Sequence, residues 1–264
     1  MDLFTFRVGT APLLVSMPHV GTHLPPDLAA RMTRDARILP DTDWHLERLY
    51  DFLDALGASV LAATHSRYAV DLNRPPDNAN LYPGQDTTGL VPVDTFSRAA
   101  VYRDGAVPDD AEVALRVERY WRPYHAQLGR ELDRLRVAHG YALLWDAHSI
   151  ASRVPRFFSG RLPDFNLGTA RGRSCAPGII EGVAAIAQRA AGYTTVLNGR
   201  FTGGYITRRY GQPNARVHAI QLELAEITYM DEAPPFAFDP ARAARLRPLL
   251  RAMLERMLEA ARRV

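Results

Sequence analysis

The stretch YALLWDAHS (Tyr141–Ser149) decides the fold, because a short apolar run ends there in Asp146 and His148. Residues 141–145 are expected to form a buried strand. Three further apolar runs end in polar clusters, namely Pro18-His19, Asp41-Thr42-Asp43 and Asp71-Leu72-Asn73-Arg74. Ligands of open α/β sheets bind outside the carboxyl ends of the strands, where such clusters converge. We therefore expect these clusters to form one catalytic floor together with Glu223.

Around this stretch, apolar runs alternate with helical patterns along the whole chain. Strands are expected over 12–17, 58–62, 68–72, 141–145, 194–197 and 217–224. Helices are expected from about 43 to 57, 109 to 138, 176 to 191 and 240 to 263, and loops over 75–92 and 152–173. This alternation predicts a three-layer α/β fold, with a mainly parallel or mixed sheet and helices on both faces.

The composition is that of one globular catalytic domain spanning residues 1–264. Hydrophobic residues make up 47% of the chain, which is enough to bury a full core. The sequence has neither an apolar run of 18 residues nor a basic segment followed by a long apolar one, so we expect no membrane span, no signal peptide and a cytoplasmic location. The single cysteine, Cys175, allows no internal disulfide.

All 32 basic residues are arginines, and this excludes several mechanisms. Schiff-base and pyridoxal chemistry need a lysine amine, and a P-loop needs Gly-Lys-Ser/Thr. The formal charge is only +3, with arginines scattered among acidic residues. We therefore expect a small-molecule substrate and no nucleic-acid partner.

His19, Asp43 and His148 have the donor types of a catalytic metal site. Two neutral imidazoles and one carboxylate leave the fourth position of a zinc ion open, although such a set accepts several divalent ions. Asp41 and Asp146 are candidates for carboxylates that orient the ligands. The alternative is a core histidine satisfied by a neighbouring acceptor, and an N-cap role for the aspartate near position 43.

Glu223 lies near the end of the last strand-like run, flanked by leucines on both sides. Burying a carboxylate there is costly without a partner or a purpose, and a partly apolar setting raises the pKa of a glutamate. Glu223 is therefore a candidate general base. A salt bridge to an arginine is the alternative, and Glu226 is a second candidate for the base.

Several arginines are candidates for substrate binding. The guanidinium of Arg74, next to Asn73, matches a substrate carboxylate, and Arg67 is placed to polarise a carbonyl or hold an oxyanion. Arg200 and Arg208 lie in the glycine-rich segment 199–211, which is typical of a mobile loop over small anions. An ordinary flexible connection explains that segment equally well.

Eight ordered motifs span nearly the whole chain: Ser16-Met17-Pro18-His19, Pro40-Asp41-Thr42-Asp43, Ser66-Arg67-Tyr68, Asp71-Leu72-Asn73-Arg74-Pro75, Trp145-Asp146-Ala147-His148-Ser149, Leu162-Pro163-Asp164-Phe165-Asn166-Leu167-Gly168, Asn198-Gly199-Arg200-Phe201 and Gln221-Leu222-Glu223-Leu224. This set resembles the N-formylglutamate amidohydrolase family. The resemblance implies hydrolysis of N-formyl-L-glutamate to formate and L-glutamate, the last step of one histidine degradation route. It also implies kinship with zinc-dependent exopeptidases of the carboxypeptidase and aspartoacylase type, and hence a zinc-exopeptidase-like fold.

The resemblance also implies roles for individual residues. His19, Asp43 and His148 would hold one zinc ion, Glu223 would be the base, Arg67 would polarise the carbonyl, and Asn73 with Arg74 would clamp a carboxylate. The sequence departs from zinc carboxypeptidases at their His-x-x-Glu motif, because Val20-Gly21-Thr22 follows His19. Asp43 is our choice for the second ligand, with Asp41 and His23 as alternatives.

Three other functions stay open at this point. The first is another zinc N-acyl amino acid amidohydrolase, similar to aspartoacylase. The second is an arginase-like dimanganese ureohydrolase, which the segment Asp146-Ala147-His148-Ser149 also resembles, although Ile150 stands where that family has an aspartate. The third is a non-catalytic dicarboxylate-binding protein with structural histidines.

Overall fold

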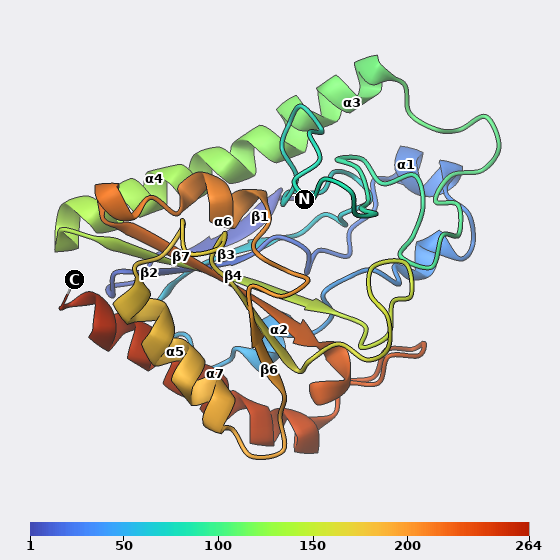
Figure 1. The fold of residues 1–264 in the computed structure, drawn as a ribbon. Coiled ribbons are helices and arrows are strands. Elements are labelled where there is room, and N and C mark those ends of the chain that lie inside the picture. Colours follow the sequence, from blue (N-terminus) through green and yellow to red (C-terminus); the bar gives the residue numbers. More distant parts are fainter. Residues whose placement is uncertain (264) are drawn as a thin grey trace.

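The computed structural model describes residues 1–263, and its centre is a mixed sheet (Figure 1). Within these residues the strands are β1 (Phe4–Arg7), β2 (Leu13–Met17), β3 (Ser59–Ala63), β4 (Ala142–Ile150), β5 (Phe165–Gly168), β6 (Thr195–Leu197) and β7 (Val217–Ala225). Their order in the sheet is β1-β3-β2-β4-β7-β5-β6. The four strands β3, β2, β4 and β7 run parallel, β1 is antiparallel to β3, and β5 is antiparallel to β7. The predicted α/β class is confirmed.

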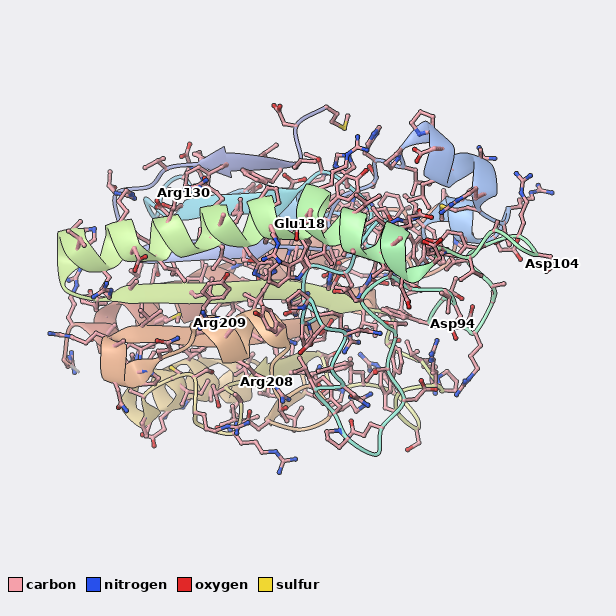
Figure 2. All side chains as sticks on the ribbon, turned by 90° about the horizontal axis from the view of Figure 1, so that it is seen from above. Asp94, Asp104, Glu118, Arg130, Arg208 and Arg209 are labelled. Atoms are coloured by element: carbon pink, nitrogen blue, oxygen red, sulfur yellow. The ribbon has the colours of Figure 1, made fainter. Side chains whose placement is uncertain are left out.

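Helices cover both faces of this sheet (Figure 1). One face is covered by α4 (Arg122–His139) and the short α6 (Tyr205–Tyr210), which Figure 2 shows side by side. The opposite face carries α2 (Leu46–Leu49), α5 (Pro177–Arg189) and α7 (Pro240–Ala261). The remaining helices, α1 (Pro26–Arg31) and α3 (Asp110–Arg116), lie toward the end of the sheet where β2, β4 and β7 finish.

The strand period of two divides the central strands into two different faces. Leu143 and Trp145 of β4 pack into the core beneath α5 and α7, whereas Ala142 and Leu144 pack beneath α4. Asp146 and His148 continue the second set, so both side chains point to the α4 and α6 face. Every residue of β4 is buried, which is why its sequence reads as a continuous apolar run before these polar residues.

The expected strand over 141–145 is too short. β4 continues to Ile150, because β7 pairs with it as far as Ile150 opposite Ala225. His148 therefore lies inside a strand rather than just past its end. The predicted 152–173 loop likewise contains β5, which pairs with the far side of β7.

The strand predicted over 68–72 is wrong, because the structure has turns there. The apolar run that suggested a strand has another explanation, because Tyr68, Val70 and Leu72 are buried in the core beneath α4. The backbone turns at Ser66–Ala69 and again at Asp71–Arg74, each closed by an N–H to C=O hydrogen bond. The helix expected from 43 to 57 is regular only over α2, after which the chain runs in turns to Gly57 at φ 66°.

The helix predicted over 109–138 is present but interrupted. A π-helical turn, Val117–Trp121, separates α3 from α4, and Gly140 ends α4 in the left-handed region at φ 79°. The predicted segments 176–191, 194–197 and 240–263 correspond to α5, β6 and α7. None of the helices among residues 1–263 is both long enough and apolar enough to span a membrane.

Candidate active site

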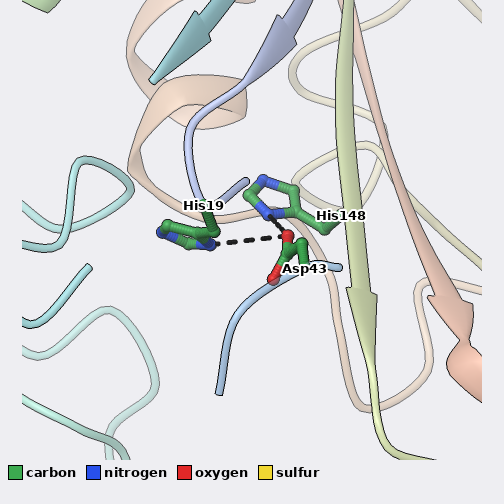
Figure 3. A group of neighbouring side chains, drawn as sticks. All are labelled: His19, Asp43 and His148. Atoms are coloured by element: carbon green, nitrogen blue, oxygen red, sulfur yellow. Dashed lines mark hydrogen bonds and ion pairs between the residues drawn. The ribbon is translucent and has the colours of Figure 1, made fainter. Parts of the chain in front are cut away.

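His19, Asp43 and His148 meet at the carboxyl ends of β2 and β4 (Figure 3). Both imidazoles turn their Nδ1 atoms toward Asp43 Oδ2, at 3.7 Å from His19 and 3.2 Å from His148. One potential ligand atom from each residue lies within 4.8 Å of the other two, and all three side chains are buried. Among residues 1–263 this is the one group of His, Cys, Asp and Glu with such geometry.

Backbone contacts hold the three residues in place. His19 follows β2 by two residues, and its carbonyl accepts a hydrogen bond from the Asp43 N–H at 3.1 Å. His148 is fixed within β4, and the N–H of the next residue, Ser149, donates to Asp43 Oδ2 at 3.3 Å. The expected convergence of segments far apart in sequence is therefore present.

The outer ring nitrogens of both histidines face buried carboxylates. His19 Nε2 lies 2.8 Å from Asp71 Oδ1, and His148 Nε2 lies 3.2 Å from Asp146 Oδ1. That Asp146 oxygen is fully buried and has no other partner, while Thr207 Oγ1 donates to Oδ2 of the same carboxylate. For His19 this is the arrangement of metal-binding histidines, in which a carboxylate holds the distal N–H and leaves the other nitrogen for the ion, whereas His148 Nε2 also lies 3.0 Å from the amide nitrogen of Asn73.

The electrostatics also fit a bound cation. Burial favours the neutral form of Asp43, but the hydrogen bonds from His148 and His19 outweigh it and lower its pKa. Burial disfavours the charged form of His148, yet Asp146 and Asp43 raise its pKa well above the usual value. Asp43, Asp71 and Asp146 together carry more negative charge than two neutral imidazoles can balance. A divalent cation would supply the positive charge that protons on the imidazoles otherwise supply.

The two alternative ligands lie elsewhere. Asp41 Oδ2 accepts hydrogen bonds from the Tyr68 hydroxyl at 2.8 Å and the Phe96 N–H at 3.0 Å, and burial raises the pKa of Asp41 to about 6. The ring of His23 packs edge-on against His65, with 4.7 Å between the ring centroids. Neither side chain belongs to the His19, Asp43 and His148 group.

Glu223 stands directly opposite His148 in the parallel register of β4 and β7, so both side chains point to the same face. Burial raises the pKa of Glu223 to about 8, near the range in which a base works. Glu223 also lines the cleft beside the histidines. Glu226 lies beyond the strand in a short 3₁₀ turn and is not part of the cleft lining.

The cleft over this floor encloses about 570 Å³, its open mouth included, and three of the predicted arginines line it: Arg67, Arg74 and Arg200. Arg67 Nη2 donates to Asp71 Oδ2 at 2.7 Å, and its Nη1 lies 3.7 Å from Asp43 Oδ1. Burial opposes the charge of Arg67, but the neighbouring carboxylates of Asp71 and Asp43 raise its pKa. Its Nε is buried with no acceptor.

Arg74 and Arg200 are less well neutralised. The nearest carboxylate to Arg74 is Asp71, at 4.0 Å, and among residues 1–263 Arg200 has none within ion-pair distance. Arg200 instead donates to the carbonyls of Phe157 and Asp86. Burial lowers the pKa of both guanidinium groups. Two partly buried cations without full partners make the cleft suited to an anionic ligand with two charges.

Arg208 does not line the cleft. It donates to the carbonyls of Gly203 and Leu81, and its guanidinium lies 4.9 Å from the centroid of the Tyr82 ring. Figure 2 shows Arg208 and the exposed Arg209 on α6, below α4. Arg208 thus joins the 75–92 loop to the 199–211 segment.

Asp71 lies in one of the four polar clusters of the sequence, but the pattern alone predicted no role for this residue. Its buried carboxylate contacts His19, Arg67 and, more distantly, Arg74. The pattern Asp-x-Asn-Arg could have indicated a role for Asp71, because a buried carboxylate beside two candidate site residues needs a partner of its own. Gln221 was also missed. It donates to the Glu223 carboxylate at 3.3 Å.

Comparisons with known sequences agree on one family. A profile of the family described as N-formylglutamate amidohydrolase matches residues 11–230. An N-formylglutamate deformylase from Pseudomonas aeruginosa is 52% identical over 257 residues, which is 97% of this chain and 96% of that protein. A second N-formylglutamate deformylase, from Pseudomonas putida, is 50% identical over 97% of this chain and 96% of its own length.

Solved structures show the same fold. The crystal structure of an N-formylglutamate amidohydrolase from Ralstonia eutropha superposes over the whole of both chains with a TM-score of 0.85 and 27% identity. A protein from Agrobacterium tumefaciens shares the fold with a TM-score of 0.73 at 16% identity, over 98% of this chain and 96% of its own.

The raised pKa of Glu223 predicts how stability depends on pH in protein dialysed against a chelator. Between its ordinary pKa of 4.5 and about 8, the folded chain keeps a proton that the unfolded chain releases. The stabilisation from this proton is complete below the ordinary pKa and is lost as the pH rises through the folded one. We expect Glu223→Gln, which cannot ionise, to show a smaller fall in unfolding free energy from about pH 5 to pH 8, measured by urea denaturation. Equal slopes in both proteins would mean that folding does not shift the pKa of Glu223.

Proposed function

This chain belongs to the N-formylglutamate amidohydrolase family, and on that premise we propose how its site hydrolyses the formyl amide of N-formyl-L-glutamate to formate and L-glutamate. The reaction needs water to attack the formyl carbon, a base to take the water proton, and positive charge near the carbonyl oxygen. The observation that carries the proposal is the meeting of His19, Asp43 and His148 beside Glu223 on the floor of an arginine-lined cleft.

We infer that His19, Asp43 and His148 hold one divalent metal ion, for which zinc is the best match to two imidazoles and a carboxylate. Bound there, such an ion polarises a carbonyl and lowers the pKa of water. Asp71 keeps the distal N–H of His19 oriented, Asp146 and the Asn73 amide flank the distal nitrogen of His148, and the Nδ1 atoms that point toward Asp43 are the metal ligands in this proposal.

Glu223 acts as the general base in this proposal. Its carboxylate takes a proton from the attacking water as the new C–O bond forms at the formyl carbon. When the C–N bond breaks, Glu223 returns this proton to the departing amino nitrogen, and the products are formate and the free amino acid. Its buried setting suits both steps, because a carboxylate with a raised pKa accepts and releases a proton near neutral pH.

Arg67 stabilises the oxygen that becomes negative during the attack. Its charge is fixed at the cleft floor by Asp71 and Asp43, so it needs no rearrangement when negative charge develops. Asn73 supports the site through both of its amide groups: Nδ2 lies 3.0 Å from His148 Nε2, and Oδ1 accepts from the Ile206 N–H.

The two carboxylates of N-formyl-L-glutamate match the two incompletely neutralised arginines. We assign the α-carboxylate to Arg74, because its Nε lies 4.0 Å from Asp71, the carboxylate that contacts His19, and the side-chain carboxylate to Arg200, which also lines the cleft. Arg208 serves by holding the loops around the cleft rather than by contacting the substrate. A place in histidine degradation and a cytoplasmic location stay predictions.

The metal assignment is tested by formate release and metal content together. Formate release from N-formyl-L-glutamate is expected to stop on chelation and to return with one equivalent of Zn²⁺ per chain. Asp43→Asn is expected to weaken metal binding at least about 100-fold, whereas Asp41→Asn should still bind one ion. Loss of the ion from Asp41→Asn, with retention in Asp43→Asn, would transfer the ligand role to Asp41.

The role of Glu223 is tested by removing its basicity alone. Glu223→Gln is expected to lower kcat by about 10²- to 10⁴-fold while leaving KM and metal content close to those of the parent protein. Glu226→Gln is the matched control, because it changes a second buried glutamate outside the cleft. A low kcat in the control with normal turnover by Glu223→Gln would make Glu226 the base.

The role of Arg200 is tested with a neutral substrate of the same shape. Arg200→Gln is expected to raise KM for N-formyl-L-glutamate by about tenfold to a hundredfold, since a charge-assisted hydrogen bond to a carboxylate is lost. KM for N-formyl-L-glutamine should change little. Arg209→Gln, on the exposed side of α6, is the control. An equal rise in KM for both substrates would show that Arg200 does not contact the side-chain carboxylate.

A further inference from the structure

The segment Leu72–Arg74 carries a proposed substrate ligand but belongs to no helix or strand. All three of its carbonyl oxygens nevertheless accept hydrogen bonds from donors that lie outside the segment. Leu72 O lies 2.8 Å from His125 Nε2, Asn73 O accepts from the Tyr205 N–H at 3.2 Å, and Arg74 O accepts from Trp121 Nε1 at 2.9 Å. Two of these three donors are the side chains of Trp121, the last residue of the π-helical turn, and His125, in the first turn of α4.

Trp121 and His125 form one rigid pair. They are four residues apart, and their rings stack with centroids 3.7 Å apart and 21° between the planes. His125 Nδ1 lies 3.0 Å from the Tyr210 hydroxyl. Burial lowers the pKa of His125 to about 3, so the imidazole is neutral. Because a carbonyl oxygen can only accept, Nε2 of the neutral ring carries the proton that it donates to Leu72 O, and Nδ1 is the acceptor beside the Tyr210 hydroxyl, which also donates to the His125 carbonyl at 3.1 Å.

The π-helical turn explains how one irregular helix reaches both the turn at 66–69 and the segment Leu72–Arg74. Arg116, just before the turn, donates through Nη1 to the carbonyls of Tyr68 and Ala69. Trp121, five residues later, donates to Arg74 O. In a regular α-helix, residues five apart point about 140° away from each other. The wider π turn over Val117–Trp121 brings both donors to one face, and such turns are frequent at functional sites.

We propose that Trp121 and His125 are positioning residues for Arg74: they fix the main chain on both sides of Asn73 so that the Arg74 guanidinium stays directed into the cleft. This rests on the proposed function, because it takes Arg74 as the ligand of a substrate carboxylate. Neither Trp121 nor His125 lines the cleft, so each acts only through the segment that it holds.

A double-mutant cycle tests the proposal with the metal-loaded enzyme. Trp121→Phe keeps the aromatic ring but removes the N–H that binds Arg74 O. It is expected to raise KM for N-formyl-L-glutamate about fivefold to tenfold and to change kcat less than about twofold. Arg74→Gln should raise KM more strongly. Adding Trp121→Phe to Arg74→Gln should then cause no further rise, because the group being positioned is gone.

Trp145→Phe is the matched control, since it also removes one buried indole N–H, here bonded to the Tyr50 hydroxyl on the opposite face of the sheet. It should lower Tm without changing KM. A rise in KM from Trp121→Phe that is equal with and without Arg74 would overturn the positioning role, and so would a loss of Tm with unchanged KM. An unchanged KM in Arg74→Gln alone would overturn the assignment of Arg74, and the inference with it.

Two variants of His125 give an independent measurement if Trp121→Phe folds poorly. Glutamine can still donate an N–H toward Leu72 O, whereas leucine cannot. We expect His125→Leu to raise KM severalfold and His125→Gln to restore most of the loss. Equal KM values for these two variants at similar Tm would contradict a role for the hydrogen bond to Leu72 O.

Discussion

The arrangement of the site depends on the burial of carboxylates around two imidazoles. Asp43, Asp71 and Asp146 are almost fully buried, and carboxylates are placed in a protein interior only with compensating charge and hydrogen bonds. His19 and His148 supply part of that compensation, and Arg67 supplies more through Asp71 and Asp43. Removing any one member leaves a buried charge without its partner, so the cluster is specified as a unit.

The sheet provides this arrangement by having two different faces. The side chains of β4 and β7 that point toward α5 and α7 are apolar except for His218 at the start of β7 and Ser149 near the end of β4, and the apolar ones form the larger core with those helices. The side chains on the other face are apolar at the start of both strands and at their last residues, Ile150 and Ala225. Between these positions they are Asp146 and His148 on β4, opposite Gln221 and Glu223 on β7. Packing against α5 and α7 can therefore stabilise strands whose other face carries polar groups for chemistry.

The sequence predicted those parts of the structure that depend on local patterns. Apolar runs located β2, β3, β6 and β7, and helical spacing located α4, α5 and α7. Strand ends also pointed to residues that the structure brings together, His19, Asp43 and His148, because parallel strands have their carboxyl ends at the same edge of the sheet. The errors arose where tertiary contacts decide. The segment 68–72 is apolar because it lies beneath α4, and β4 extends past Trp145 because β7 offers it a partner as far as Ala225.

The π turn could not be read from the sequence either, and its cause lies in the segment that it faces. Residues 68–74 make turns rather than a strand, so no sheet neighbour satisfies their carbonyls, and a buried carbonyl without a donor is costly. Arg116, Trp121 and His125 provide those donors, and a regular helix could not place the first two on one face. The loop thus depends on the irregular helix above it, because that helix donates the hydrogen bonds that the loop carbonyls need. This loop carries Asn73 and Arg74. The loop and the helix are each explained only when the other is considered, which is why a pattern confined to either segment predicts neither.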